Sequence, residues 1–218
     1  KTAEAFEETA HVDAEEAQDF EKELAVIVAR NPQGETAVFP AVEMVFHPEQ
    51  NLVEFLFSPA EITATIEKQA EKIAVDLINK LELVGVLAVE MFLTKDGQVL
   101  INEIAPRPHN SGHQTIRGNE SSQYEQHLRA ITGLPLGSTK SFGFSGMLNL
   151  LGAEGFTGPA RYEGLTDILA IPGVFPFLYG KKITKPFRKM GHITILGDSK
   201  DAIIDKANQV KNLIRVIS

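Results

Sequence analysis

The hydrophobic pattern at the start of the chain predicts strands. Apolar and partly β-branched runs at 23–30, 37–46 and 52–57 are separated by the turn signals NPQGET and HPEQN. Pro40 would place the second of these strands at a sheet edge or a bulge, because proline donates no hydrogen bond to a ladder. The first elements therefore predict a sheet rather than a helical bundle.

Residues 60–81 show the clearest helical periodicity in the chain. Ser58 is the expected N-cap, and Pro59 suits the first turn. Apolar residues recur at every third or fourth position and share one face: Ile62, Ile66, Ala70, Ile73, Leu77 and Leu81. Weaker helical patterns follow at 121–132 and 199–214.

Residues 85–94 and 99–104 predict a β-hairpin across the turn KDGQ, whose Asp-Gly pair would supply the positive φ angles. Antiparallel strand pairs mixed with helices predict an α+β fold rather than a βαβ alternation. A change of character near residue 138 predicts two domains. These are 1–137 and a small β-rich domain at 138–218 that is closed by the last helix.

Composition narrows the classes of protein that this fold could serve. The chain has no cysteine, which excludes disulfide frameworks, cysteine zinc sites and thiol nucleophiles. A net charge of −8 disfavours a broad nucleic-acid-binding face. No apolar run approaches the ~20 residues that span a bilayer, and the N-terminus lacks the layout of a signal peptide. We therefore expect a soluble, cytoplasmic protein that binds neither nucleic acid nor membranes.

The charge is unevenly distributed along the chain. Residues 1–24 carry nine acidic residues against two lysines, whereas residues 179–192 carry five cations and no acid. A compact basic loop in an acidic chain fits a small anionic ligand, and a solvated surface loop is the alternative.

Two acids stand inside the apolar strands of the predicted hairpin. Glu90 lies in LAVEMF and Glu103 in LINEIA, and the turn would place them opposite each other on one face. Two carboxylates buried in a sheet need a compensating cation, and oxygen ligands without cysteine or clustered histidine favour Mg²⁺. The alternatives are that one or both acids face solvent or pair with Arg107.

The string that follows this hairpin carries a resemblance to a known family. NEIAPRPHNSGHQT (102–115) resembles the signature of the ATP-grasp carboxylate–amine ligases. Within that family it resembles the members that carboxylate an aminoimidazole ribonucleotide. SQYEQHLRAITGLPLG (122–137), MLNLLG (147–152) and KPFRKMGHITI (185–195) continue the match.

The resemblance runs from roughly residue 14 to the C-terminus and implies both a fold and a reaction. The fold is an ATP-grasp C-terminal subdomain, with a mixed, largely antiparallel sheet and flanking helices, followed by the small β-rich domain. The reaction belongs to purine biosynthesis: ATP phosphorylates bicarbonate to carboxyphosphate, and 5-aminoimidazole ribonucleotide captures the CO₂. ATP and Mg²⁺ would be the cofactors, bicarbonate the co-substrate, and the full-length protein a homodimer.

The resemblance also implies roles for individual residues. The metal ligands would be Glu90 and Glu103. The catalytic residues would be Arg107, His109, Ser111 and His113. The ATP-binding residues would be Ala14, Glu15, Glu16, Phe20, Glu23 and Asn102. The substrate-binding residues would be Asn110, Gly112, Lys181, Lys182, Lys185 and Arg188.

Several of these assignments leave alternatives open. The string does not tell which histidine moves a proton, and the match does not decide between Lys181 and Lys182 at the substrate phosphate. His192, in the last motif, is ambiguous. Ala105 stands where many family members carry an asparagine metal ligand, so water or phosphate would complete the metal shell.

Family members begin with a Rossmann-like domain and a subdomain with a Gly-rich loop, and neither pattern occurs in this sequence. We therefore expect a C-terminal fragment that does not turn over by itself.

Two other functions compete with the carboxylase. One is another ATP-grasp ligase, of the formate-dependent glycinamide ribonucleotide transformylase or biotin carboxylase type. The other is a non-catalytic nucleotide-binding module.

Overall fold

The computed structural model describes residues 20–46 and 53–218, so the candidate ATP-binding residues Ala14, Glu15 and Glu16 lie outside the described residues. The chain divides into two compact units. The first contains the chain up to Val45 together with Ser58–Phe142, and the second contains Phe46–Phe57 and Gly143–Ser218. Both units combine helices with antiparallel strands, which confirms the predicted α+β class.

The first unit is built on an antiparallel sheet with the order β3-β1-β5-β6, and β2 also pairs with β1. Its strands are β1 (Phe20–Arg30), β2 (Thr36–Val38), β3 (Val42–Phe46), β5 (Gly85–Thr94) and β6 (Val99–Ala105). The single strand predicted at 37–46 is in fact two short strands separated around Pro40. The break fits a residue that cannot donate to a ladder.

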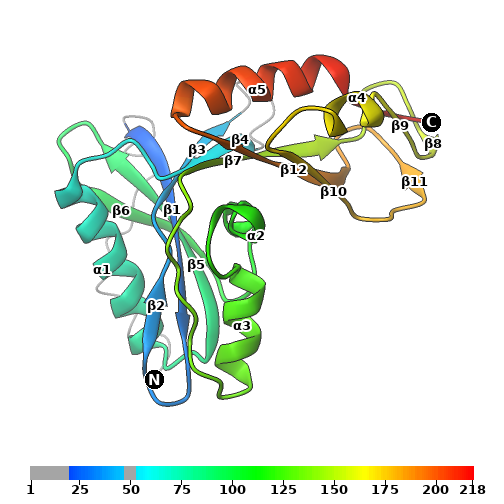
Figure 1. The fold of residues 1–218 in the computed structure, drawn as a ribbon. Helices are drawn as coiled ribbons and strands as arrows, with labels where there is room; N and C mark the ends of the chain where they lie inside the picture. The colour runs from blue at the N-terminus through cyan, green and yellow to red at the C-terminus, as the bar shows by residue number, and fades with distance from the viewer. Residues whose placement is uncertain (1–19, 47–52) are drawn as a thin grey trace. The chain divides into compact units, whose positions relative to one another are not determined.

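Alternation along these strands gives the sheet two different faces. On one face Leu24, Val26 and Leu87 pack against helix α1 (Ala64–Lys80). On the other face Ile27 and Ala88 form a smaller apolar cluster. Figure 1 shows α1 and α3 (Gln123–Ile131) on opposite sides of the strands.

Helix α1 begins later than the sequence predicted. Its N-cap is Thr63, whose side chain accepts a hydrogen bond from Ile66 N at 3.3 Å. The prediction of Ser58 as the cap is wrong, because Ser58 is the last residue of strand β4 (Val53–Ser58). The fully buried positions of α1 are Ala70, Ala74 and Ile78, so the centre of its buried face differs from the predicted one. The predicted apolar residues other than Ala70 flank that centre and are partly buried.

The hairpin of β5 and β6 confirms the prediction, but its turn differs in detail. The loop of residues 95–97 is closed by a hydrogen bond from Thr94 N to Gln98 O of 2.9 Å. Only Gly97 has a positive φ, of 84°, and Asp96 does not share it. A hairpin loop of this length commonly has one left-handed residue, whereas a two-residue loop of type I′ needs two. After β6 the chain forms η2 (Asn110–Gly112) and α2 (Thr115–Gly118) before α3.

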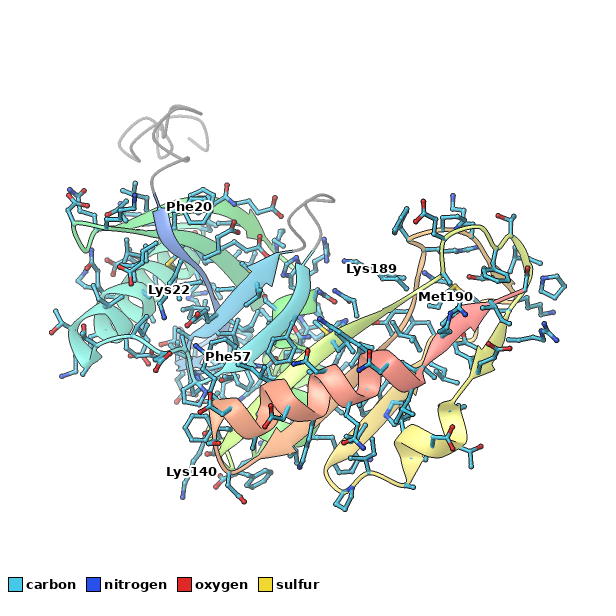
Figure 2. The ribbon with its side chains drawn as sticks, turned by 90° about the horizontal axis from the view of Figure 1, so that it is seen from above. Phe20, Lys22, Phe57, Lys140, Lys189 and Met190 are labelled. Atoms are coloured by element: carbon cyan, nitrogen blue, oxygen red, sulfur yellow. The ribbon has the colours of Figure 1, made fainter. Side chains whose placement is uncertain are left out.

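The main strands of the second unit pair in the order β10-β12-β7-β4. Besides β4, they are β7 (Phe144–Leu151), β10 (Val174–Leu178) and β12 (Lys189–Gly197). Helix α5 (Lys200–Leu213) lies over these strands (Figures 1 and 2) and contributes Ile203 and Val210 to the core. Figure 2 labels Lys189 and Met190 at the start of β12, the first exposed and the second fully buried.

Smaller elements complete this unit. They are α4 (Leu165–Leu169) and two short strand pairs, β8 (Gly158–Pro159) with β11 (Ile183–Thr184) and β9 (Arg161–Glu163) with β13 (Arg215–Ile217). None of the helices in the described part of the chain is both long and apolar enough to span a membrane.

Candidate active site

The predicted carboxylate pair forms at the hairpin. Glu90 on β5 lies directly opposite Glu103 on β6, and directly opposed residues project to the same face. The register shifts by one residue beside this pair, where Asn102 is the additional residue of a β-bulge. The bulge allows Ile101 and Ile104 to pack toward α1 while Glu103 faces the other side. The two carboxylates therefore share the face that α1 does not cover.

The two acids differ in burial. The side chain of Glu90 is 12% exposed, whereas Glu103 is exposed. The expectation that both acids are buried is therefore wrong for Glu103. Its strand, β6, is the edge of the sheet of the first unit, and an edge strand has a neighbour on one side only.

A third carboxylate, Glu23, lies on the same face. Ala25 of β1 is opposite Glu90, and Glu23 precedes Ala25 by two residues, so both project in the direction of Glu90. Partial burial and, second to it, the charge of Glu90 raise the pKa of Glu23 to about 7. This face of the sheet therefore holds more negative charge than its surroundings stabilise, which is a condition that favours a bound cation.

The carboxylate oxygens of Glu90 and Glu103 suit a hard divalent cation that is also bound by oxygens from outside the protein. Within residues 20–46 and 53–218, no group of three or more His, Cys, Asp or Glu side chains is placed to hold a metal ion. Glu90 and Glu103 alone would leave most of a Mg²⁺ shell to phosphate and water oxygens. Magnesium is usually bound in this way beside nucleotide phosphates.

The loop that carries the HNSGH string approaches this carboxylate face. The Nδ1 atom of His109 is 3.4 Å from Glu90 Oε1 and 3.0 Å from Ser111 Oγ. The structure therefore brings together one predicted metal ligand and two predicted catalytic residues. His109 is also mostly buried, so its ring lies under the surface of the site.

The buried amide of Gln123 holds this loop, and sequence reasoning missed it. Its Oε1 accepts a hydrogen bond from His109 N at 2.8 Å, and its Nε2 donates to His109 O at 2.7 Å. The Nε2 atom also lies 3.0 Å from His113 Nδ1. A Cβ on Gly112 would stand 2.5 Å from Gln123 Oε1, so the missing side chain of Gly112 makes room for this amide.

Two neighbours complete the support of the loop. The hydroxyl of Thr115 donates to Gly112 O at 2.6 Å and accepts from Gln123 N at 2.9 Å. The ring of Tyr124 stacks on His113 with centroids 5.9 Å apart, and its hydroxyl is 3.2 Å from His113 Nδ1. A polar residue at the start of a helix, directly after a motif, was the only signal in the sequence that could have identified these contacts.

The remaining predicted residues of this unit lie in varied environments. Arg107 is exposed, and its Nη1 donates to Pro108 O at 3.2 Å. Among the described residues Arg107 forms no ion pair, so it does not bridge to either glutamate. The Nδ2 atom of Asn110 is buried without a hydrogen-bond partner in the described part of the chain. Phe20, labelled in Figure 2, stacks on Phe92 with ring centroids 4.7 Å apart.

The basic loop belongs to the second unit, and its backbone is firmly held. Arg188 N donates to Lys185 O at 3.1 Å, which closes a turn in which Phe187 has a φ of 61°. Gly152 N donates to Arg188 O, and Phe187 N donates to Gly152 O, each at 2.9 Å. A Cβ on Gly152 would collide with the carbonyl oxygen of Lys185.

The cationic side chains of this loop differ in how they are engaged. Lys181 Nζ donates to Lys189 O at 2.6 Å, and Arg188 Nη1 donates to Ile183 O at 2.9 Å. Lys182 and Lys185 are exposed. None of these four predicted substrate ligands forms an ion pair with a described residue, so their positive charge is available to an anion.

His192, which the sequence left ambiguous, is a buried side chain of the second unit. It is 3% exposed and stacks on Phe177 with centroids 4.7 Å apart. The hydroxyl of Tyr179 is 3.0 Å from its Nδ1. Burial lowers the pKa of His192 to about 4, so the imidazole is neutral at physiological pH. These contacts describe a packed, uncharged side chain.

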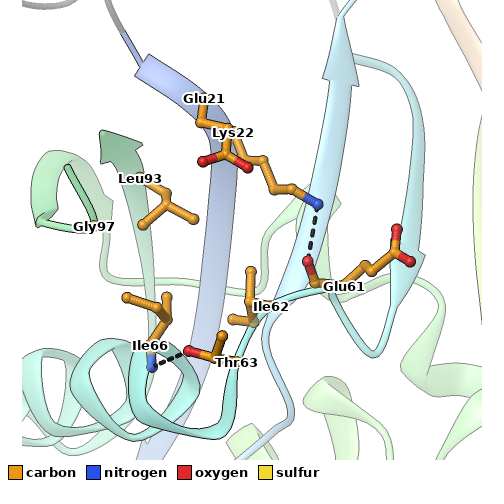
Figure 3. Close-up of a pocket in the computed structure, with 8 residues that line it drawn as sticks. All are labelled: Glu21, Lys22, Glu61, Ile62, Thr63, Ile66, Leu93 and Gly97. Carbon is orange, nitrogen blue, oxygen red and sulfur yellow. Dashed lines mark hydrogen bonds between the residues drawn. The ribbon is translucent and has the colours of Figure 1, made fainter. Parts of the chain in front are cut away.

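A separate cavity of about 500 Å³ lies on the α1 side of the first unit (Figure 3). Its wall is partly apolar, with Ile62, Ile66 and Leu93, while Lys22 donates to Glu61 O at 2.8 Å across it. Because Leu93 packs with the α1 core, this cavity is not part of the carboxylate face.

Comparison with known protein families identifies the family to which the first unit is similar. Residues 1–124 match the sequence profile of the ATP-grasp domain, which is more than half of the chain. The chain belongs to the ATP-grasp family. Residues 145–206 match the phosphoribosylaminoimidazole carboxylase C-terminal domain. The chain is similar to N5-carboxyaminoimidazole ribonucleotide synthase of Bacillus subtilis (strain 168), with 44% identity over 187 residues, which cover 86% of this chain and 47% of the relative.

Solved structures agree with this result. The N5-carboxyaminoimidazole ribonucleotide synthetase of Thermotoga maritima has 47% identity and a TM-score of 0.85, covering 92% of this chain and 53% of that chain. The synthase of Aspergillus clavatus, in complex with ADP and 5-aminoimidazole ribonucleotide, has 33% identity and a TM-score of 0.78, covering 89% and 52%. The chain thus spans about half the length of these relatives.

Proposed function

We propose that the protein containing this chain catalyses the ATP- and bicarbonate-dependent carboxylation of 5-aminoimidazole ribonucleotide to N5-carboxyaminoimidazole ribonucleotide. The observation that carries the proposal is the Glu90–Glu103 pair beside the His109–His113 loop, in a chain similar to synthases of that name over both of its units. The reaction is a ligation in purine biosynthesis. Placement in the cytoplasm is part of the proposal, and the relative from Vigna aconitifolia is named as chloroplastic.

The acidic face would hold the nucleotide. Glu90 and Glu103 would bind Mg²⁺, which when bound would offset charge on the transferred phosphoryl group. Glu23 would accept hydrogen bonds from the ribose hydroxyls of ATP, and Phe20 would pack on the adenine. Asn102 would contribute a further polar contact from the bulge.

The residues after the hairpin would handle the carboxylating intermediate. Arg107 has an exposed guanidinium without an ion pair among the described residues, and its fork geometry suits two oxygens of a phosphate or carboxyphosphate. His109 and Ser111 would act on the bound intermediate, since they lie next to Glu90.

Each unit carries candidate residues for ribonucleotide recognition. In the first unit these are Asn110 and the backbone at Gly112. In the second unit they are the cations of the basic loop, which form no ion pair with a described residue and suit a 5′-phosphate: Lys181, Lys182, Lys185 and Arg188. Lys182 is the better candidate of the two adjacent lysines, because Lys181 already donates to a backbone carbonyl.

An ADP-release assay on the complete protein tests the proposal. ATP, bicarbonate and 5-aminoimidazole ribonucleotide together should give turnover, and omission of the ribonucleotide should reduce it to background. Glycinamide ribonucleotide with formate, and biotin with bicarbonate, serve as controls for the other ATP-grasp reactions. Turnover with either control and none with aminoimidazole ribonucleotide would contradict the proposal, as would nucleotide binding without any turnover.

A further inference from the structure

The orientation of the Gln123 amide is determined by its neighbours. The N–H of His109 can only donate, so the atom 2.8 Å away must be the amide oxygen. The carbonyl of the same residue can only accept, so the atom 2.7 Å away must be the amide nitrogen. Reversing the amide would break both hydrogen bonds in a side chain that is fully buried.

This orientation decides which nitrogen of His113 carries the proton. One N–H of Gln123 Nε2 is used by His109 O, and the Nε2 atom is also 3.0 Å from His113 Nδ1. An N–H that faces Nδ1 requires an unprotonated nitrogen, and the Tyr124 hydroxyl, 3.2 Å from the same atom, can donate as well. Neutral His113 therefore carries its proton on Nε2.

The surroundings prevent Gln123 from turning away. The space beside its amide exists because Gly112 has no side chain, and the Gln123 backbone N–H is bonded to the Thr115 hydroxyl. The loop backbone and the His113 ring are thus fixed by one side chain that itself has no route to solvent.

We propose that Gln123 is a positioning residue that holds His113 as the Nε2–H tautomer, so that His113 serves the site as a hydrogen-bond donor and not as a base. The role of that donor toward the ribonucleotide or its carboxylating agent rests on the proposed function. The tautomer itself does not, because it follows from contacts within the protein.

Nitrogen NMR of the 218-residue chain, labelled with ¹⁵N-histidine, tests the tautomer without any substrate. The Nδ1 resonance of neutral His113 is expected at the position of an unprotonated imidazole nitrogen, and Nε2 at that of a protonated one. Gln123→Glu replaces the donor by an acceptor, so the proton should move to Nδ1 and the two resonances should exchange positions. A wild-type spectrum with protonated Nδ1 would overturn the proposal, even if the variant fails to fold.

Gln126→Glu is the matched control. Gln126 is also fully buried on α3, and its amide likewise bonds a backbone carbonyl and N–H, those of Gly137 at 2.5 and 3.0 Å, but no histidine. This variant should leave the His113 resonances unchanged. Tyr124→Phe should leave them unchanged too, because Gln123 remains. A tautomer change in either control, or none in folded Gln123→Glu, would contradict the proposal.

An activity measurement separates this inference from the proposed function. In the complete protein, Gln123→Glu should lower turnover at saturating substrate at least tenfold, and Gln126→Glu less than twofold. Equal losses of turnover in both variants would contradict a positioning role for Gln123, because they would show that it only supports the fold. If the complete protein shows no carboxylation at all, the proposed function fails while the NMR result still decides the tautomer.

Discussion

Each unit contains an antiparallel strand pair that carries a polar side chain among apolar neighbours, and the two pairs treat it differently. In the β10–β12 pair His192 is opposite Phe177, stacks on it and lies at hydrogen-bond distance from the Tyr179 hydroxyl. In the β5–β6 pair Glu90 is opposite another acid, Glu103. Like charges directly opposite each other destabilise a sheet, whereas a neutral, hydrogen-bonded ring packs as part of the core.

The electrostatic consequences also differ. Burial lowers the pKa of His192 to about 4, so the second unit contains the side chain in its uncharged form. In the first unit burial and Glu90 raise the pKa of Glu23 to about 7, so the sheet retains a proton there near neutrality. Repulsion between acids that persists in the folded chain, as between Glu23 and Glu90, indicates a binding site more strongly than a buried side chain that is uncharged, such as His192.

The largest effect is expected for Glu103→Gln. Turnover of the complete protein should fall by about two to three orders of magnitude, because the proposed metal ligand is lost. The free energy of unfolding should stay the same or rise, because the substitution removes repulsion at an exposed edge position. ADP release and urea unfolding measure the two outcomes. If Glu103→Gln retained turnover, the opposed acids of the β5–β6 pair would have no functional role, and the contrast with the β10–β12 pair would be lost.

Gly152→Ala tests whether the basic loop depends on its backbone support. The new Cβ would collide with Lys185 O, so we expect a loss of about 3 kcal/mol in the free energy of unfolding. Gly155→Ala is the control. Gly155 has a φ of 82° and no atom within 4 Å of an added Cβ, so only about 1 kcal/mol should be lost. Equal losses in urea unfolding would mean that the contact with Lys185 is unimportant.

His192 should make the chain less stable in mild acid. The unfolded imidazole binds a proton below its usual pKa of 6.5, whereas the folded one resists protonation until about 4. The free energy of unfolding should therefore fall as pH decreases from about 6.5 to about 4, by about 3 kcal/mol relative to His192→Phe. Urea unfolding of both proteins across this range gives the difference, and parallel curves would show that His192 is not held neutral.

Glu23 should act in the opposite direction and more weakly. The folded carboxyl keeps its proton up to about pH 7, whereas the unfolded one loses it near 4.5, so stability should fall as pH rises through this window. Glu23 is only half buried, and solvent screening limits the effect to about 1 kcal/mol. Glu23→Gln should remove this dependence in metal-free buffer. A Gln variant with an unchanged slope would show that folding does not raise the pKa of Glu23.

Local patterns predicted the hairpin, and with it the Glu90–Glu103 pair, because alternation and an Asp-Gly turn are properties of adjacent residues. They did not predict the Asn102 bulge, which depends on packing against α1. Nor did they reveal Gln123, whose importance arises only when α3 meets the loop at His109. The placement of β4 in the second unit depends on pairing with β7, far away in sequence, which periodicity does not register.

The extra residue at position 102 has a consequence for anyone who aligns or edits this strand. Removing Asn102 would restore a regular alternation of side chains along β6. The residues on one side of the deletion would then project to the opposite face of the sheet. Either Glu103 would point toward the aliphatic core, or Ile101 would become exposed to water. A sequence alignment that places a gap one residue away from position 102 would likewise assign Glu103 to the wrong face of the strand. Homology models and deletion libraries built across this segment should therefore be checked for the direction of this acid before anything else is read from them.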